Sequence, residues 1–330
     1  YHEAVTAEEA AGTEQFLYIA RTLDHNLRLF TGDHEEQMLS AYADSYRTQD
    51  TNLMLTYGGE TVYTSFGTVP TYGENAISQT RWEGKRYLLD TGASHLFAKN
   101  AGVMGGDLSK IDMGVLSHAH FDHSDGMAKF FALNKTAPFY LRKGAGENCY
   151  HAHKLLGRFT YHEYIGIHKG FLKRFADRIR FAEGDALIAP NVYLVPHKMP
   201  GLESIGERAH LSVKENGKFR YDSFDHEQSL VFDTPKGLFV MNSCSHGGAD
   251  NIVKEIEATF PGKKIYALLG GFHLFRYKDE VVRVFAERLR ELDVQKIYTG
   301  HCTGNRAFEI LHEVLGDRVE QMHAGLTVEL

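Results

Sequence analysis

The chain has 330 residues, enough for one large domain or two small ones, and its 43% hydrophobic and 24% charged residues are ordinary for a globular protein. A formal net charge of −7 argues against a nucleic-acid partner, whose phosphates favour a basic surface. Three cysteines are too few for a disulfide framework, and no apolar run approaches the roughly 18–20 residues of a membrane span. We therefore expect a cytoplasmic protein without a membrane partner; export after removal of a signal peptide is the alternative.

Residues 1–50 are predicted to form a helical extension. Thr6 with Glu9, and Asp33 with Glu36, have the spacing of capping boxes, which start helices. We expect a helical hairpin that packs on the main domain; a lid, or an arm that joins two copies into a homodimer, is the alternative. The apolar residues at helical spacing are Phe16, Leu17, Ile19, Ala20, Leu23 and Leu27.

The remaining chain, residues 51–330, is predicted to be one domain. It begins with two hairpins, one turning at Gly58-Gly59 and the other at Glu83-Gly84. A helix over residues 127–133 and a short strand over residues 139–142 follow.

Residues 147–180 are predicted to be mostly helical. This segment is rich in basic residues, which we interpret as a solvated helix face. The alternative is a positively charged patch that draws an anionic substrate toward the site. The basic residues are Lys169, Lys173, Arg174, Arg178 and Arg180.

The last third of the chain is predicted to return to strands, and their alternation with helices suits two sheets with helices outside. The predicted strands are residues 192–195, 211–221 folded about Asn216-Gly217, 229–233, 238–242, 265–269 and 296–299. The predicted helices lie near residues 250–260, 280–292 and 306–315.

The most informative segment is His118-Ala119-His120-Phe121-Asp122-His123, which has four candidate metal ligands within six positions. An apolar, strand-like lead-in, residues 113–116, comes just before it. Imidazoles and carboxylates are ligands that zinc and similar divalent transition ions bind. Histidines also occur on solvated loops and in hydrogen-bonded cores, but this order of ligand-type residues favours a metal site.

The spacing within this segment indicates two ions. Residues two apart on an extended strand share a face, so His118 and His120 can bind one ion together. Asp122 and His123 follow where the strand ends, and they can reach a second ion. Two ions roughly 3.5–4 Å apart can activate water. Zinc is the favoured metal, with manganese or iron as alternatives.

Four further segments accompany this pattern. They are Leu88-Leu89-Asp90-Thr91-Gly92, Asn242-Ser243-Cys244-Ser245-His246-Gly247-Gly248, Leu269-Gly270-Gly271-Phe272-His273-Leu274 and Thr299-Gly300-His301-Cys302-Thr303-Gly304. Together with the histidine-rich segment, they resemble the metallo-β-lactamase superfamily, and in particular a branch that includes dihydropterin–ribofuranosylaminobenzene phosphate synthases and metal-dependent hydrolases. The resemblance runs from about Ala76 to Leu330. It implies an α/β fold, the four-layer αββα sandwich of dinuclear metal hydrolases, here with an N-terminal helical extension.

The resemblance also implies roles for residues outside the histidine-rich segment. Asp90 would support the ligand histidines by hydrogen bonds from behind. His301, after the strand over residues 296–299, would bind the second ion beside Asp122 and His123.

Two residues are candidates for the third histidine ligand of the first ion. His246 follows the strand over residues 238–242 and carries the motif of the branch, so it is favoured. The rival, His197, follows the strand over residues 192–195 and superficially resembles the His-Thr-Pro-Gly segment that provides this ligand elsewhere in the superfamily. If it is not a ligand, His197 would bind substrate.

Two further residues each have two alternative roles in this comparison. Many members of the family have a Gly-Asp pair, whose aspartate bridges both ions, where this chain has Ser243-Cys244. A Cys244 thiolate can replace that bridge; a buried small residue, with a weaker second ion, is the alternative. His273 is predicted to receive a phosphate or carboxylate of the substrate, and a hydrogen-bonded core histidine is the alternative.

The predicted function is a metal-dependent hydrolase that uses metal-activated water on a small, anionic, ester- or phosphate-bearing metabolite. Asp122 would orient the attacking water, and His273 or His197 would bind the leaving side. The alternative is a transferase resembling 7,8-dihydropterin-6-methyl-4-(ribofuranosyl)-aminobenzene phosphate synthase. A nucleic-acid phosphodiesterase and a non-catalytic metal-binding protein are less favoured.

Overall fold

The computed structural model describes residues 52–57, 60–65, 78–103, 106–155 and 159–322, together with Leu326 and Val328. The chain divides into two compact units, Tyr1–Tyr72 and Gly73–Leu330. In the first unit, β1 (Asn52–Tyr57) pairs antiparallel with β2 (Glu60–Ser65), which confirms the first predicted hairpin. The helices predicted within residues 1–50 lie outside the described residues.

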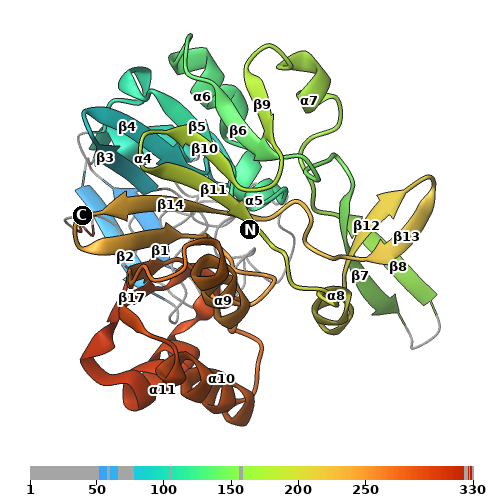
Figure 1. Cartoon of the computed structure of the whole chain (residues 1–330). Coiled ribbons are helices and arrows are strands. Elements are labelled where there is room, and N and C mark those ends of the chain that lie inside the picture. Colours follow the sequence, from blue (N-terminus) through green and yellow to red (C-terminus); the bar gives the residue numbers. More distant parts are fainter. Residues whose placement is uncertain are drawn as a thin grey trace. The chain divides into compact units, whose positions relative to one another are not determined.

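A five-stranded sheet forms one half of the second unit (Figure 1). Its strands are, in spatial order, β3 (Ser78–Trp82), β4 (Lys85–Leu89), β5 (Met113–Val115), β6 (Phe139–Arg142) and β9 (Ile179–Ala182). β3 and β4 form the second predicted hairpin, and both turn residues, Glu83 and Gly84, have positive φ. The outer face is covered by α4 (Leu96–Val103), α6 (Met127–Leu133) and α7 (Phe171–Arg174). These helices share one hydrophobic core with the strands, which includes Phe97, Phe131, Phe171, Leu88 and Phe139.

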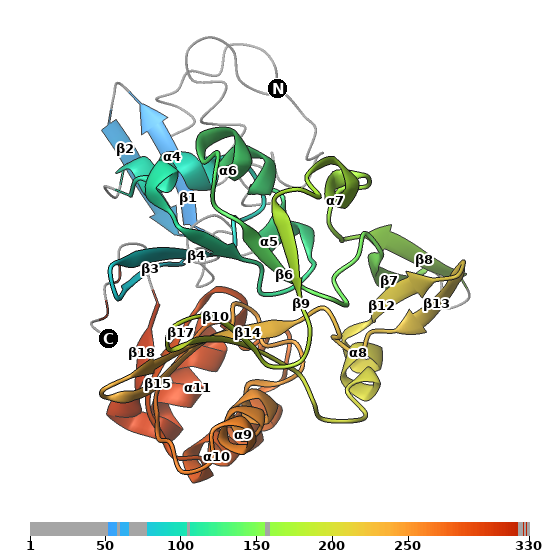
Figure 2. The same ribbon diagram turned by 45° about the horizontal axis from the view of Figure 1, so that its top comes forward.

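A seven-stranded sheet forms the other half. Its strands are, in spatial order, β10 (Ala186–Ala189), β11 (Val192–Pro196), β14 (Gln228–Thr234), β15 (Gly237–Met241), β16 (Ile265–Leu269), β17 (Val294–Thr299) and β18 (Val319–Gln321). Its outer face is covered by α9 (Ala249–Thr259), α10 (Asp279–Glu291) and α11 (Asn305–Leu315), on the opposite side of the unit from α4, α6 and α7 (Figure 2). Within the described part of the chain, none of the helices is long and apolar enough to cross a bilayer.

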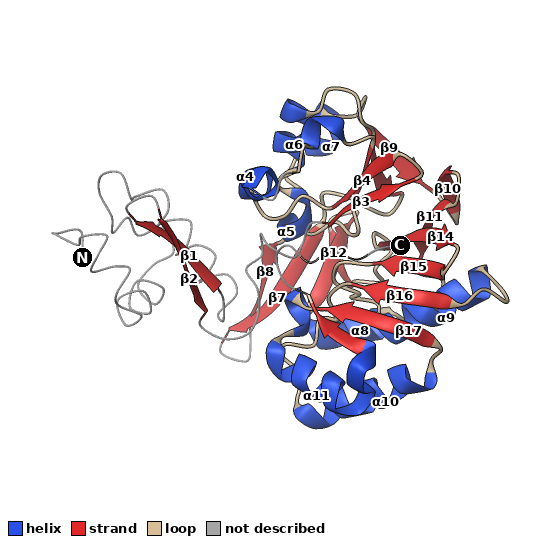
Figure 3. Ribbon diagram, turned by 90° about the vertical axis from the view of Figure 1, so that its left-hand side faces the viewer, coloured by secondary structure: helices blue, strands red, loops and turns tan. Residues whose placement is uncertain are grey.

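The two sheets pack face to face. Tyr87 and Val115 of the first sheet share a buried core with Leu194 and Phe232 of the second, and the rings of Tyr87 and Phe232 are 5.3 Å apart. Figure 3 shows the strands as inner layers with helices on both outer sides. The predicted αββα sandwich is therefore confirmed for residues 78–322.

A smaller sheet projects from one side of the sandwich (Figure 1), and only its hairpin about Asn216-Gly217 was predicted. Its strands are, in spatial order, β13 (Lys218–Tyr221), β12 (Leu211–Glu215), β7 (Cys149–Leu155) and β8 (Phe159–Tyr164), and α8 (Glu203–Ala209) precedes β12. The prediction that residues 147–180 are mostly helical is thus wrong, since the short α7 is the only helix among the residues described there, 147–155 and 159–180. Their strand form depends on the pairing of β7 with β12, roughly 60 residues away, which no local periodicity reveals.

Candidate metal centre

The candidate ligands come from loops that follow strand ends of both sheets. The histidine-rich segment follows β5 and ends in the single turn α5 (Phe121–Ser124). Residues 242–248, 270–274 and 300–304 follow β15, β16 and β17, which are parallel to one another. Because the carboxyl ends of parallel strands meet at one edge of a sheet, the separate sequence motifs come together there.

Three histidines form the first group of candidate ligands. Each of His118, His120 and His246 offers one nitrogen, and these atoms lie within 4.8 Å of one another. In each ring the Nε2 atom is buried and has no hydrogen-bond partner among the described residues. A buried nitrogen without a partner costs about 1–3 kcal/mol, which binding of a metal ion would offset.

The pKa shifts of this group also suit metal ligands. Burial, and then repulsion from neighbouring histidines, holds the pKa values of His118 and His246 well below the usual range. Burial, and then His226, lowers the pKa of His120 to about 3. All three rings are therefore neutral at pH 7, the form that binds transition ions.

Asp122, His123 and His301 form a second group, whose ligand atoms also lie within 4.8 Å of one another. His123 Nε2 lies 3.4 Å from Asp122 Oδ2, and the rings of His123 and His301 are 5.2 Å apart. Burial lowers the pKa of His123, but the carboxylates of Asp122 and Asp90 outweigh it and raise the pKa to about 10. An ion bound here would have to displace that proton.

Cys244 lies between these groups. Its Sγ is 3.2 Å from His123 Nε2, and its sulfur falls within one donor group with His118 and His123 and within another with His273 and Cys302. This position suits the bridging role that the sequence suggested for Cys244. Cys302 was given no role from the sequence, because a cysteine beside a ligand histidine carries no spacing signal.

His273 reaches the centre from the loop after β16. Its ring centroid is 4.4 Å from that of His246, its backbone N–H donates to Cys302 Sγ at 3.3 Å, and its buried Nδ1 has no hydrogen-bond partner among the described residues. It therefore lies beside the candidate ligand His246.

Asp90, the residue expected to support the ligand histidines, lies behind them and is hydrogen-bonded to this region. Its Oδ2 is 2.8 Å from His123 Nδ1 and accepts hydrogen bonds from the hydroxyls of Ser117 (2.7 Å) and Ser243. Ser117 Oγ in turn lies 2.9 Å from His118 Nδ1. The hydroxyl proton of Ser117 faces Asp90, so we assign the ring proton of His118 to Nδ1, which leaves Nε2 for an ion.

The structure does not bring His197 into these groups. His197 is buried, with Nε2 at 2.6 Å from Glu227 Oε2 and Nδ1 at 2.9 Å from Glu255 Oε2. Glu227 also accepts the backbone N–H groups of His246 and Gly247, both at 2.9 Å. His197 thus acts on the His246 loop through Glu227, a carboxylate that sequence reasoning missed.

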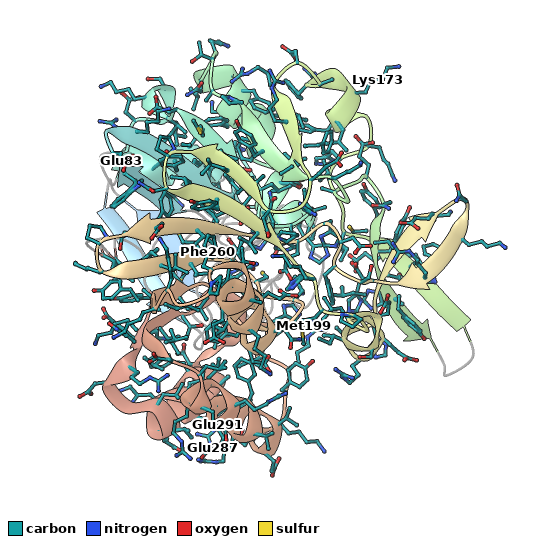
Figure 4. The ribbon with its side chains drawn as sticks, in the orientation of Figure 1. Glu83, Lys173, Met199, Phe260, Glu287 and Glu291 are labelled. Atoms are coloured by element: carbon teal, nitrogen blue, oxygen red, sulfur yellow. The ribbon has the colours of Figure 1, made fainter. Side chains whose placement is uncertain are left out.

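The basic residues of the segment 147–180 do not share a helix face, which corrects that interpretation. Arg178 donates to the carbonyl oxygens of Asn134 and Ala137, and Arg180 lies on β9. Lys173 extends outward from α7 (Figure 4). Of this set, only Lys173 and Arg174 lie on one helix, and that helix has a single turn.

The backbone at the centre is unusual for non-glycine residues. Asp90, Ser245, His273 and His301 have φ values of 62°, 50°, 49° and 50°. Such left-handed conformations cost about 1–3 kcal/mol each and turn the chain sharply after a strand. The glycines of Gly270-Gly271 are required by close packing: a Cβ at position 270 would lie 1.6 Å from the Asn242 carbonyl oxygen.

Comparison with known proteins is consistent with this architecture. No family model matches the chain. The solved structure of Tm1679, a metal-dependent hydrolase of the β-lactamase superfamily, is 29% identical in sequence, with a TM-score of 0.62 and coverage of 78% of this chain and 96% of that chain.

Two curated proteins of Methanocaldococcus jannaschii are also similar. One, 7,8-dihydropterin-6-methyl-4-(β-D-ribofuranosyl)-aminobenzene-5′-phosphate synthase, is 28% identical over 74% of this chain and 84% of its own length. The other, an uncharacterized protein, is 28% identical over 70% of this chain and 84% of its own length. In fold and in sequence the chain is therefore similar to the β-lactamase superfamily of metal-dependent hydrolases to which Tm1679 belongs.

Proposed function

We propose that this chain is a metal-dependent hydrolase that activates water at a two-ion centre and acts on a small ester- or phosphate-bearing molecule. The main support is the convergence of two buried donor groups from both sheets of the sandwich. The unpartnered Nε2 atoms of His118, His120 and His246 make this arrangement costly unless they have a ligand.

In this proposal each group holds one ion. His118, His120 and His246 hold the first, and Asp122, His123 and His301 hold the second, with Cys244 between them. Zinc suits these donors, and manganese or iron are alternatives. Bound ions would supply Lewis acidity and lower the pKa of water toward neutrality.

The side chains around the ions have separate tasks. Burial raises the pKa of Asp122, but the neighbouring histidines, His123 first, lower it below its usual value. Asp122 is therefore ionised at pH 7 and can accept a hydrogen bond from the attacking water. His273, with its buried Nδ1, would bind the leaving side of the substrate.

A transferase is the second candidate. It is supported by the similarity to the Methanocaldococcus jannaschii synthase, which extends over 74% of this chain. The same donor groups would then bind and activate a substrate without consuming water.

Metal analysis and isotope labelling test both ideas. We expect close to two transition ions per chain purified without chelator. His246→Ala should remove at least one ion and lower turnover by about 100-fold or more, as expected when a metal ligand is lost, while His312→Ala on the exposed side of α11 should change neither.

Turnover of generic phosphodiester, lactone and β-lactam substrates in ¹⁸O-labelled water then separates the candidates, since a hydrolase incorporates the label and a transferase does not. A chain that binds no transition ion, and gains neither activity nor stability from added zinc, manganese or iron, would contradict the proposal.

A further inference from the structure

The loop between β16 and α10 carries His273 into the metal centre and leaves the next side chains exposed. Phe272 and Leu274 are buried in the core under α9, α10 and α11, whereas Phe275 is 39% exposed. The Phe275 N–H donates to the Cys302 carbonyl oxygen at 3.3 Å. These contacts hold the loop in place, so the position of Phe275 is set by the fold.

Phe275 lies directly beside the centre. Its ring centroid is 5.2 Å from that of His273, with the two rings nearly perpendicular, and the ring of His273 is 4.4 Å from that of His246. An exposed aromatic side chain at this distance offers an apolar face on which a flat ring of a substrate can pack.

Arg276 adds a positive charge to this surface. Its guanidinium carbon lies 5.1 Å from the centroid of the Phe275 ring. Within the described residues the Arg276 side chain has no ion pair or hydrogen bond, whereas the exposed Arg220 and Arg306 are paired with carboxylates. An arginine without a carboxylate partner can bind a phosphate or carboxylate through two parallel hydrogen bonds.

His151 on β7 of the projecting sheet is close enough to Arg276 for its charge to act on the imidazole ring. Burial, then His153 and then Arg276, lowers the pKa of His151 on β7 to about 4. The His151 ring is therefore neutral at pH 7 and adds no positive charge to that of Arg276.

We propose that Phe275 and Arg276 form a subsite that binds an aromatic group carrying a phosphate or carboxylate, beside the metal centre. This rests on the proposed function, since it assigns a substrate class to the same site. Phe275 packs against the ring, Arg276 binds the anionic group, and His273 links the subsite to the ions.

Calorimetric titration of the metal-loaded, full-length chain with two probes, phenyl phosphate and inorganic phosphate, tests the subsite. We expect phenyl phosphate to bind about tenfold more tightly than inorganic phosphate, because only phenyl phosphate can pack on Phe275. Arg276→Gln should weaken both probes about tenfold. Phe275→Leu should remove the preference for phenyl phosphate and leave inorganic phosphate unchanged.

Two matched variants serve as controls. Arg174, also exposed, lies 5.2 Å over the Phe175 ring on the other half of the sandwich, so Arg174→Gln removes a similar arginine away from the site. Phe219 on β13 is 40% exposed, so Phe219→Leu matches Phe275→Leu. Neither control should change the affinity for either probe.

Equal affinity for the two probes, no binding of phenyl phosphate, or an affinity unchanged by Arg276→Gln would overturn the subsite. Metal content measured on the same samples separates this failure from that of the proposed function. A chain with two ions and no effect of Arg276→Gln disproves only the subsite, whereas a chain unable to bind transition ions contradicts the hydrolase.

Discussion

Ala119 has no functional side chain, yet its backbone lies between two candidate ligands, His118 and His120. Its N–H donates to His226 Nδ1 at 3.2 Å, and His226 Nε2 lies 2.9 Å from Asp222 Oδ2. His226 and Asp222 also fall within a donor group with His120 and Cys149. Since both nitrogens of His226 are used in hydrogen bonds, we interpret this group as a support for the ligand strand.

Asp222→Asn is expected to disturb the metal ligands without touching them. Asp222 accepts hydrogen bonds on both oxygens, from Phe224 N–H at 2.7 Å and from His226. The side-chain amide of the asparagine variant has only one oxygen, so its NH2 group would face one of these two N–H donors. We expect metal affinity to fall about tenfold, as for other residues that orient ligand histidines. Competition with a chromophoric chelator measures this.

The matched control is Asp225→Asn, three residues further on and exposed, which should leave metal affinity unchanged. Equal affinities for the two variants would show that the hydrogen bond to Ala119 does not position the ligands.

At the scale of elements, a buried chain of charged groups joins β11, β14 and α9 to the loop that carries His246. His197 follows β11, Glu227 precedes β14, and Glu255 lies on α9. Glu255 Oε1 also accepts the backbone N–H groups of Lys198 and Met199, at 2.6 and 2.8 Å. The fold thereby fixes the His246 loop against both the sheet and its covering helix.

This chain of groups predicts a pH dependence of stability. Burial lowers the pKa of His197, but hydrogen bonds to Glu227 and Glu255 outweigh it and raise the pKa from 6.5 to about 9. Because the folded state binds the proton more tightly, the stabilisation is complete below about pH 6.5 and is lost as the pH rises through 9. The loss should approach about 3 kcal/mol.

Urea denaturation between pH 6.5 and 9.5 measures the effect. His197→Gln should flatten the decline in the free energy of unfolding, and His312→Gln should keep it. If the free energy of unfolding declines equally with pH in the parent chain and both variants, groups other than His197 cause the decline.

At the scale of the whole molecule, the candidate metal ligands come from both halves of the sandwich. The histidine-rich segment follows a strand of the first sheet, while His246 and His301 follow strands of the second. Ions held by both sets of residues would link the sheets, and ions that bind the folded chain stabilise it by mass action.

Removal of metal should therefore lower the melting temperature. We expect a loss of at least about 5 °C on adding excess chelator, from an ion contribution of about 4 kcal/mol at a thousandfold excess over Kd. Scanning calorimetry with chelator, and with chelator already saturated by zinc, gives the comparison. A melting temperature insensitive to chelator, in a chain shown to contain metal, would mean that the ions do not link the sheets.

The sequence by itself determined the elements whose signals are local. The turns at Glu83-Gly84 and Asn216-Gly217 are each marked by a glycine, which adopts positive φ readily, and both hairpins are present. The spacing of residues 118–123 puts four candidate ligands together within one strand end and one turn. The sandwich fold was predicted from the family resemblance, whose motifs mark the ends of successive strands.

Only the tertiary structure decided which distant residues meet those ligands. His246 and His197 both follow strands, so local pattern could not separate them; the fold places His246 beside His118 and His120 and engages His197 with two carboxylates. Glu227 and Cys302 have no local signal either, since their roles depend on distant side chains or on backbone groups. Asp222 pairs with the nearby His226, but that pair matters through Ala119, which lies far from it in the sequence. β7 became a strand for the same reason: β12, from a remote part of the chain, supplies hydrogen-bond partners along one of its edges, while β8 pairs with the other.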